Sequence, residues 1–199
     1  MNIHTTPATK AGGQHICPWW LAYFFDNPFR RMVHPADKIL GPYVTQGMTV
    51  LDFGCGFGHY SLGMARLTGP SGEVVAADVQ QKMLDKTMSR ACKAGLDEII
   101  RPLLCDGRGI GEALDLDFAL ACNSLHETPD PAALLSEVFG LLKPGGRMLL
   151  MEPCAHLKAG QFEDEVMKAE AAGFSIAGQP KVVRQMCRLL EKPHGRVDA

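Results

Sequence analysis

Apolar residues follow two alternating periods along most of this chain. Short runs rich in Val, Ala and Leu, typical of buried strands, are separated by longer segments in which apolar residues recur every three or four positions, typical of helices. The predicted strands cover residues 48–53, 73–78, 100–105, 117–122 and 146–152, and the helices between them cover residues 58–68, 80–94 and 130–142. Such alternation requires right-handed crossovers, so it predicts an α/β fold with a parallel sheet.

The pattern changes in the last part of the chain. A helix is predicted over residues 162–172, followed by strands over 174–178 and 182–190 that are joined by the short turn Gly178-Gln-Pro180. A connection of this length favours antiparallel pairing. We therefore expect the parallel sheet to end in an antiparallel hairpin.

The first predicted strand runs into a turn of alternating glycines, Val50-Leu-Asp-Phe-Gly-Cys-Gly-Phe-Gly58. Gly54, Gly56 and Gly58 can adopt positive φ and carry no Cβ atom, so the backbone can approach a small molecule closely. The second strand ends in Asp78, 24 residues beyond Gly54, where a ribose held over the turn would offer its hydroxyl groups. These features predict a nucleoside-binding domain.

The spacing of the glycines and the charge of the residues around them indicate which nucleoside cofactor the turn binds. A dinucleotide site requires G-x-G-x-x-G, with the pyrophosphate at the N-terminus of the following helix. His59 stands where the third glycine of that motif would be, and no Lys or Arg lies between Val50 and Met64. A cationic cofactor without phosphate therefore fits the turn better.

The pattern Asp52-x-Gly-x-Gly-x-Gly58 resembles motif I of the class I S-adenosylmethionine-dependent methyltransferases. The resemblance continues through Asp78, Asp106 and Asn123 to the proline-glycine turn and strand of 141–153, and it covers about residues 36 to 190. It implies a Rossmann-like seven-stranded sheet of order 3-2-1-4-5-7-6, with strand 7 antiparallel and helices on both faces.

The resemblance also implies where the cofactor binds. Gly54 and Gly56 would border its methionine part, Asp52 would help to hold its ammonium group directly or through water, and Phe57 would lie near the methionine tail. The backbone at Asn123 would meet the amino end. The complete set of implied cofactor positions is Asp52, Gly54, Cys55, Gly56, Phe57, Gly58, Asp78, Val79, Asp106, Gly107 and Asn123.

For the adenosine part, the resemblance implies that Asp78 binds the ribose hydroxyls and that Val79 packs on the adenine. Asp106, followed by Gly107, would accept a hydrogen bond from the adenine amino group. An acidic residue at a strand end also often caps the next helix. That alternative stays open for Asp78 and Asp106.

His126, in Asn123-Ser-Leu-His-Glu127, is the candidate catalytic base. Methyl transfer mainly requires alignment of donor and acceptor and exclusion of water, so a base is needed only if the acceptor must lose a proton. An imidazole with the ordinary pKa of about 6.5 is largely neutral near pH 7. The alternative is that His126 only stabilises its loop.

Cys17, Cys122 and Cys154 could converge at neighbouring strand ends, and three thiolates would bind a soft metal or metalloid. No paired ligand spacing supports this, and buried thiols that pack as small hydrophobic groups are more common. We therefore predict no metal site. Cys154 is instead a candidate contact for the acceptor.

An aromatic segment, Trp19-Trp-Leu-Ala-Tyr-Phe-Phe25, precedes the alternating part. Trp19, Trp20 and Tyr23 could face the acceptor if this segment closes over the site as a lid. The alternative is a helix that packs on the sheet edge. We expect a disordered tail over 1–16, a helical cap over 17–46 with a second helix over about 35–44, and the S-adenosylmethionine-binding domain over 47–192.

The composition of the chain argues against some classes of binding partner and indicates a cellular compartment. The 199 residues carry a net charge of -2, without the clustered basic residues that nucleic acid requires. Seven cysteines without a C-x-x-C pair favour a reducing environment. The N-terminus lacks a signal-peptide pattern, and the aromatic segment is shorter than the roughly 20 residues of a membrane span. We expect a cytoplasmic protein; homodimer formation is left open.

Together these observations predict an enzyme that transfers a methyl group from S-adenosylmethionine to a small-molecule acceptor. The motifs are most similar to those of the ubiquinone and menaquinone C-methyltransferases and related small-molecule enzymes. Two alternatives are a nicotinamide-dependent oxidoreductase on the same sheet and a non-catalytic S-adenosylmethionine-binding protein.

Overall fold

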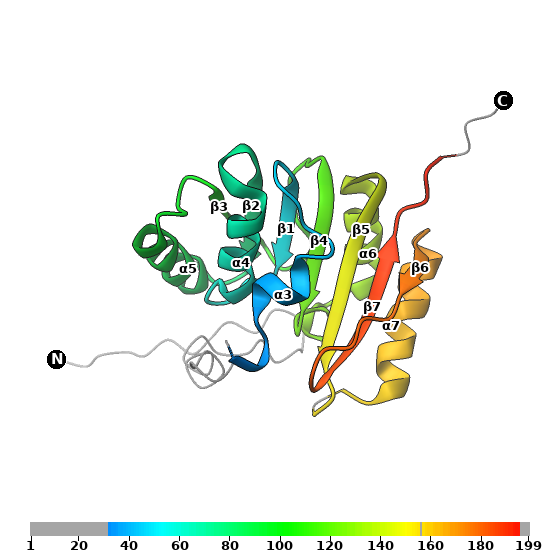
Figure 1. Cartoon of the computed structure of the whole chain (residues 1–199). Coiled ribbons are helices and arrows are strands. Elements are labelled where there is room, and N and C mark those ends of the chain that lie inside the picture. The colour runs from blue at the N-terminus through cyan, green and yellow to red at the C-terminus, as the bar shows by residue number, and fades with distance from the viewer. Residues whose placement is uncertain (1–31, 156, 196–199) are drawn as a thin grey trace.

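A seven-stranded sheet forms the centre of the computed structural model, which describes residues 32–155 and 157–195 (Figure 1). The strand order is β3-β2-β1-β4-β5-β7-β6. Neighbouring strands from β3 to β5 pair in parallel, and β7 is antiparallel to β5 and β6. The strands are β1 (Thr49–Phe53), β2 (Glu73–Asp78), β3 (Ile100–Leu104), β4 (Leu116–Cys122), β5 (Leu142–Pro153), β6 (Ser175–Gly178) and β7 (Gln185–Glu191). The predicted sheet is confirmed.

Helices cover both faces of the sheet. On one face lie α3 (Ala36–Leu40), α4 (His59–Thr68) and α5 (Gln81–Ala94), and on the other lie α6 (Pro131–Leu141) and α7 (Ala159–Ala171). Two short 3-10 helices, η1 (Gly69–Ser71) and η2 (Leu125–Glu127), lie in connections. The chain thus folds in three layers.

Each face of the sheet has its own hydrophobic core. On the first face, Met64 of α4 and Leu84 of α5 are buried in one cluster with Val50, Val74 and Phe118. Burial of a side chain of this size contributes about 1.5–3 kcal/mol. Because both faces are covered, the central strands are apolar on both sides, which explains the continuous apolar runs in the sequence.

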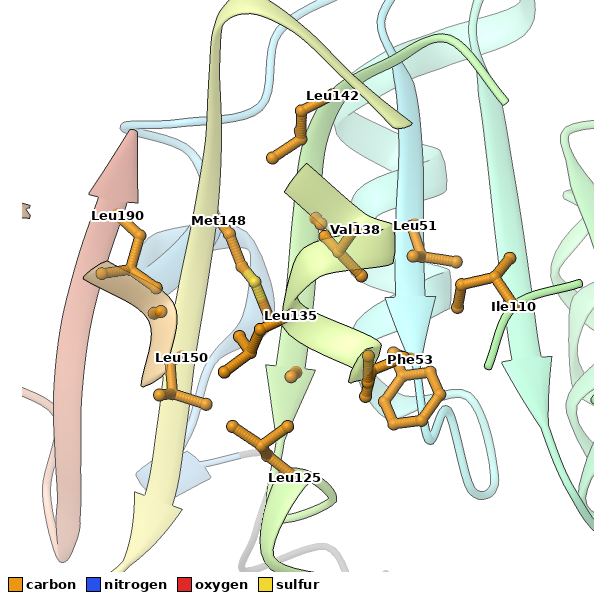
Figure 2. Packing of buried hydrophobic residues seen from close by; sticks show 14 of the residues in the cluster. Leu51, Phe53, Ile110, Leu125, Leu135, Val138, Leu142, Met148, Leu150 and Leu190 are labelled. Carbon is orange, nitrogen blue, oxygen red and sulfur yellow. The ribbon is translucent and has the colours of Figure 1, made fainter. Parts of the chain in front are cut away.

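Figure 2 shows the second core. Leu135 and Val138 of α6 lie over the sheet between Leu51 of β1 and Met148 of β5, and all four are essentially inaccessible to solvent. Leu125 of η2 lies at the carboxyl end of this cluster. The loop after β4 is therefore anchored in the core at a residue next to His126.

Some boundaries differ from the predicted ones for local reasons. The predicted helix over 35–44 ends at Leu40, because Gly41 is followed by Pro42, which has no N–H to donate. The last strand begins at Gln185 instead of 182, because Arg184 has a φ of 59° that interrupts an extended strand. The hairpin connection is thus longer than the predicted turn at 178–180.

Two further elements begin earlier in the sequence than predicted. Helix α7 begins at Ala159, three residues before the predicted start, and Gln161 Oε1 accepts from Lys158 N at 3.1 Å at its N-terminus. Strand β5 begins at Leu142, which pairs with Leu116 before an irregularity in the β4–β5 register. The proline-glycine turn therefore lies within an extended segment.

The segment before α3 crosses the edge at which the parallel strands end. His34 Nε2 donates to Val183 O, before β7, at 2.7 Å, and His59 Nε2, at the start of α4, donates to His34 O at 2.8 Å. The segment thus connects the hairpin with the first turn of α4.

Parts of the predicted organisation lie outside the described residues. The tail over 1–16 and residues 17–31 of the cap are among them, and the described part of the cap contains α3. Within residues 32–155 and 157–195, every helix is too short or too polar to cross a bilayer.

Candidate functional site

Three glycines form a tight turn between β1 and α4. Gly54, Gly56 and Gly58 have φ values of 70°, 56° and 74°, in a region that costs residues with a Cβ atom roughly 1–2 kcal/mol. The N–H groups of Gly54 and Cys55 donate to Ala77 O of β2 at 2.9 and 3.0 Å. The turn therefore folds against the end of the neighbouring strand.

The three glycines have different surroundings. A Cβ atom on Gly54 would lie 2.5 Å from Cβ of Ser124, and one on Gly58 would lie 2.7 Å from Cγ2 of Thr87. Close packing thus requires glycine at both positions. Among residues 32–155 and 157–195, a Cβ atom on Gly56 would meet no atom within 4 Å, so within this part of the chain Gly56 borders open space.

Asp78 ends β2 beside Gly56. Its Oδ2 accepts from Gly56 N at 3.0 Å, and its Oδ1 accepts from Gln80 N at 2.9 Å. Burial raises the pKa of this carboxyl group, while the backbone N–H groups of Gln80, Gly56 and Val79 lower it. Because α5 has Gln80 as its N-cap, Asp78 does not cap that helix. A carboxylate has about four acceptor positions, so Asp78 can still accept from hydroxyl groups.

Asp52 lies in the interior of the fold. It is 2% exposed, and Ser61 Oγ of α4 donates to its Oδ2 at 2.5 Å. The carboxyl group thus connects β1 to the first turns of α4, next to the glycine turn. Its predicted role toward an ammonium group stays a prediction.

Cys55 and Phe57 are also buried. Burial raises the pKa of the Cys55 thiol well above its ordinary range, and the charges of Asp52 and Asp78 raise it further. Arg90 Nη1 donates to Phe57 O at 2.7 Å. Since both side chains pack within the fold, only the backbone atoms at these positions could contact a cofactor.

The end of β3 places Asp106 and Gly107 near Val79. Asp106 is exposed, and its Oδ1 accepts from Arg108 N at 2.8 Å. A Cβ atom on Gly107 would lie 3.8 Å from Cγ1 of Val79. The structure therefore places Gly107, which follows the predicted adenine contact Asp106, beside Val79, the other predicted adenine contact.

Asn123 follows β4 and has a φ of 56°, which Asn tolerates better than most residues. Its N–H donates to Met151 O at 2.8 Å, and Ser124 Oγ donates to Phe53 O at 3.0 Å. Asn123 Oδ1 is buried and accepts no hydrogen bond from the described part of the chain. A buried acceptor without a donor is costly. This oxygen fits a ligand that brings its own donor, such as an ammonium group.

His126 lies in η2 and is held by a buried glutamate. Its Nδ1 is 2.6 Å from Glu152 Oε2, and Glu152 is 0% exposed. Glu152 Oε1 accepts from Leu125 N at 3.0 Å and from His126 N at 3.4 Å. One carboxyl group thus fixes both the imidazole ring and the backbone of the loop after β4.

This arrangement sets the proton positions on His126. A buried carboxylate is an acceptor, so Nδ1 carries a proton and Nε2 of the neutral ring has a free lone pair. The hydrogen bond to Glu152 raises the pKa of His126, burial lowers it, and the charges of Glu152, Glu127 and Glu165 raise it further. The imidazole at the end of β4 is thus fixed in orientation, and its Nε2 lies 4.0 Å from Glu127 Oε1.

The sequence pattern missed the part played by Glu152, which it placed only at the end of the predicted strand over 146–152. The available signal is the acid itself, which follows the apolar run Met148-Leu-Leu-Met151 within a strand. A carboxylate in such a place needs a partner. The partner could not be named, because His126 is 26 residues away in sequence.

The other candidates for acceptor contacts are only partly described. Trp19, Trp20 and Tyr23 lie outside the described residues, as does Cys17 of the three-cysteine alternative. Cys122 is buried and Cys154 is exposed. Over residues 32–155 and 157–195, His, Cys, Asp and Glu form no group of three or more that could hold a metal ion.

A cavity of about 460 Å³ opens between α3, α4 and α5. It shares Gly58 with the glycine turn, but Asp78, Asn123 and His126 are absent from its lining. Its basic side chains are partly engaged, since Arg66 pairs with Asp37 at 3.1 Å. The chemistry described above therefore lies elsewhere, at the carboxyl ends of the strands.

Known proteins are similar to this chain in sequence. A family of methyltransferase domains matches residues 44–179. A demethylmenaquinone methyltransferase from Lactococcus lactis is 32% identical over 111 residues, which are 53% of this chain and 42% of that protein. A ubiquinone biosynthesis O-methyltransferase from Xanthomonas axonopodis pv. citri is 29% identical over 137 residues, 66% of this chain and 54% of that protein. The matched part of the chain spans about half the length of these curated relatives.

Solved structures share the fold. An S-adenosylmethionine-dependent methyltransferase from Aquifex aeolicus has a TM-score of 0.75 and 24% identity, over 87% of this chain and 97% of that one. An identity of this size shows a common fold, and the domain match adds the family. The sheet order, the glycine turn and the match over residues 44–179 agree: the chain belongs to the class I S-adenosylmethionine-dependent methyltransferases.

Proposed function

We propose that the chain transfers a methyl group from S-adenosylmethionine to a small-molecule acceptor, with His126 as the base that receives the acceptor's proton. The observation that carries this proposal is the 2.6 Å hydrogen bond between His126 Nδ1 and the fully buried Glu152. It orients a half-buried imidazole at the end of β4, where Ser124 packs against Gly54 of the glycine turn.

The glycine turn and the neighbouring strand ends would hold the cofactor. Gly56 borders open space, Asp78 has free acceptor positions for ribose hydroxyls, and Asn123 Oδ1 offers a buried acceptor for the ammonium end. Bound S-adenosylmethionine supplies an electrophilic methyl group. The chain then has to align the acceptor and exclude water.

His126 and Glu152 have different roles in the proposed proton transfer. Nε2 would take the proton from the acceptor's O–H group, and the ring would become an imidazolium. The carboxylate of Glu152 stabilises this cation through Nδ1. Because the pKa of His126 is raised and the neutral ring is the active form, the acid limb of the rate profile should lie above the ordinary histidine range.

A hydroxyl-bearing aromatic acceptor suits this chemistry best. A phenolic oxygen becomes a good nucleophile once its proton is removed, whereas a thiol, with a pKa of about 8.5 against about 10 for a phenol, ionises with less help from a base. The relative named as a ubiquinone biosynthesis O-methyltransferase supports transfer to an oxygen atom. The exposed Cys154, after β5, and the aromatic residues of the cap are the proposed acceptor contacts.

Two measurements test this function. Titration calorimetry should show binding of S-adenosylhomocysteine and none of NAD; preference for NAD would favour the oxidoreductase alternative. The full-length chain should then be incubated with radiolabelled S-adenosylmethionine and a panel of catechols, quinols, aliphatic alcohols and amines. We expect methyl transfer to a phenolic hydroxyl, and tight cofactor binding without transfer to any acceptor class would favour the non-catalytic alternative.

A further inference from the structure

The cavity between α3, α4 and α5 is a concave site that the proposed methyl transfer does not use. Its volume of about 460 Å³ falls within the range of about 300–1,000 Å³ that is typical of small-molecule sites. Leu62 and Arg66 of α4 lie one helical turn apart, and Arg90, Lys93 and Ala94 lie within one turn of α5. One face of each helix therefore lines the cavity.

The lining of this cavity carries an excess of positive charge. Arg66, Arg90 and Lys93 supply three positive charges, and in the described part of the chain Asp37 supplies the one negative charge. The net charge of the lining is thus +2 when His59 is neutral. The whole chain has a net charge of -2, so the excess is local. A cleft lined by charges of one sign concentrates ligands of the opposite sign.

The acid of the cavity is held by an exposed ion pair. Arg66 Nη2 lies 3.1 Å from Asp37 Oδ1, and Arg66 Nε lies 3.3 Å from both carboxylate oxygens. The two side chains are 48% and 52% exposed. A pair this exposed contributes little to stability. An anionic ligand could therefore replace Asp37 as the partner of Arg66.

Arg90 connects the cavity with the glycine turn. Its Nη1 donates to Phe57 O at 2.7 Å, and Gly58 of the turn also lines the cavity. A guanidinium group has five N–H donors, and the bond to Phe57 uses one of them. Arg90 is thus fixed at the inner end of the basic side chains.

The remaining walls of the cavity are apolar. Pro35 and Ala36 line it from the side of α3, and Leu62 and Ala94 line it from α4 and α5. Apolar walls with a few convergent polar groups are the usual composition of a small-molecule site, in which the polar groups fix the orientation of the ligand. The combination favours a ligand that is itself part apolar and part anionic.

We propose that this cavity is a second ligand site, separate from the proposed cofactor and acceptor sites, and that it binds a small molecule with an apolar body and a carboxylate or phosphate group. The anionic group would bind Arg66, Arg90 and Lys93. The apolar body would contact Leu62 and Ala94. Arginine binds carboxylates and phosphates through paired N–H groups, so the two anions form one chemical class here.

Methyl NMR of the full-length chain tests where such a ligand binds. The probes are phenyl phosphate and benzoate, which carry the two anions, together with inorganic phosphate and benzyl alcohol, which each lack one half of the proposed ligand. We expect phenyl phosphate or benzoate to shift the methyl resonances of Leu62 and Ala94 and to leave those of Leu125, in the opposite core (Figure 2), unchanged. The tighter of these two probes identifies the preferred anion.

Two results of this titration would overturn the proposal. One is the absence of shifts at Leu62 and Ala94 with either anionic aromatic probe at millimolar concentration. The other is binding of benzyl alcohol as tight as that of the anionic probes, because the charge of the lining would then have no part in recognition. Inorganic phosphate should bind at least about fivefold more weakly than phenyl phosphate, since it lacks the apolar body.

Two substitutions in the exposed ion pair should have opposite effects. Arg66→Gln removes a cation and should weaken binding of the preferred probe by about fivefold or more, the low end for hydrogen bonds to charged groups. Asp37→Asn removes the competing anion and should strengthen binding by about two- to fivefold. Lys168→Gln removes an exposed cation from α7, on the other face of the sheet, and should have no effect. Weaker binding in both Arg66→Gln and Asp37→Asn would show that the pair only maintains the local structure and would overturn the proposal.

A competition measurement distinguishes this site from the proposed function. The titration is repeated with saturating S-adenosylhomocysteine, and the shifts at Leu62 and Ala94 should persist. Displacement of the probe by S-adenosylhomocysteine would place the probe in the cofactor site and overturn the proposal. If S-adenosylhomocysteine itself does not bind while the shifts at Leu62 and Ala94 remain, the second site is supported and only the proposed function fails.

Discussion

The carboxylate that ends β2 is bonded to backbone N–H groups, whereas the histidine that follows β4 is bonded to a side chain of another strand. Asp78 accepts from Gly56 N and Gln80 N, so its geometry depends on how the backbone turns. His126 depends on the carboxyl group of Glu152 on β5. The proposed cofactor end thus relies on backbone groups at Asp78, and the proposed acceptor end relies on a pair of ionisable side chains.

This difference corresponds to two proposed tasks, which are cofactor binding and proton transfer from the acceptor. Every member of the family must bind the same cofactor, which a fixed backbone turn can do with little dependence on pH. The proposed acceptor end handles the acceptor's proton, and there the hydrogen bond to Glu152 raises the pKa of His126. Substitutions at the two ends should therefore change different measured quantities.

The largest expected effect is at the acceptor end. His126→Ala removes the proposed base and should lower kcat by about 10²–10⁴, the usual contribution of general base catalysis. The affinity for S-adenosylhomocysteine, measured by calorimetry, should stay within about twofold of the wild type, because the cofactor end is unchanged. The exposed His194 supplies the control variant His194→Ala, which should have wild-type activity. Unchanged kcat in His126→Ala would reduce His126 to a structural residue.

The corresponding substitution at the proposed cofactor end is Gly56→Val. A branched side chain would enter the open space at Gly56 and strain a positive φ, so the affinity for S-adenosylhomocysteine should fall at least about 100-fold, or about 2.7 kcal/mol. The measurement is calorimetry, with circular dichroism to show that the fold is kept.

Gly95 offers a matched control for backbone strain. It has a φ of 66°, and a Cβ atom there would also meet no atom within 4 Å, but it lies at the C-terminal end of α5. Gly95→Val should lower Tm by about as much as Gly56→Val and leave cofactor affinity unchanged. Equal losses of affinity in the two variants would mean that strain, and not a lost binding surface, explains the result.

A smaller effect is expected at Asp78. Asp78→Ala removes the acceptor proposed for the ribose and the hydrogen bond to Gly56, and should weaken S-adenosylhomocysteine binding by about 1.5–3 kcal/mol. Asp115→Ala removes an exposed acid before β4 and serves as the control. A loss below about 0.5 kcal/mol would place Asp78 outside the binding site.

Most of the fold could be predicted from local signals. Strand β2 has the predicted bounds, and α4, α5 and α6 begin and end within one residue of the predicted bounds. Gly95 ends α5 with a left-handed φ, and Asp130 Oδ1 accepts from Ala133 N at the start of α6. Such capping and turn preferences act over a few residues, so the sequence displays them directly.

The acceptor end could be predicted only in part, because its contacts join distant segments. The pattern indicated His126 as a candidate base but not its hydrogen bond to Glu152 on another strand. The loop after β3 is a similar case: Glu137 of α6 accepts from Ile110 N and Gly111 N at 2.8 and 2.9 Å. No local preference encodes pairs this far apart in sequence.

The hold of Glu152 on the loop after β4 matters for protein engineering. A designer who transplants residues 123–128 into another sheet would carry His126 without the carboxyl group that fixes its ring and backbone. The grafted histidine would rotate freely in water. The smallest transferable unit is therefore a pair of adjacent strand ends, and libraries that diversify this loop should keep the glutamate on β5 constant.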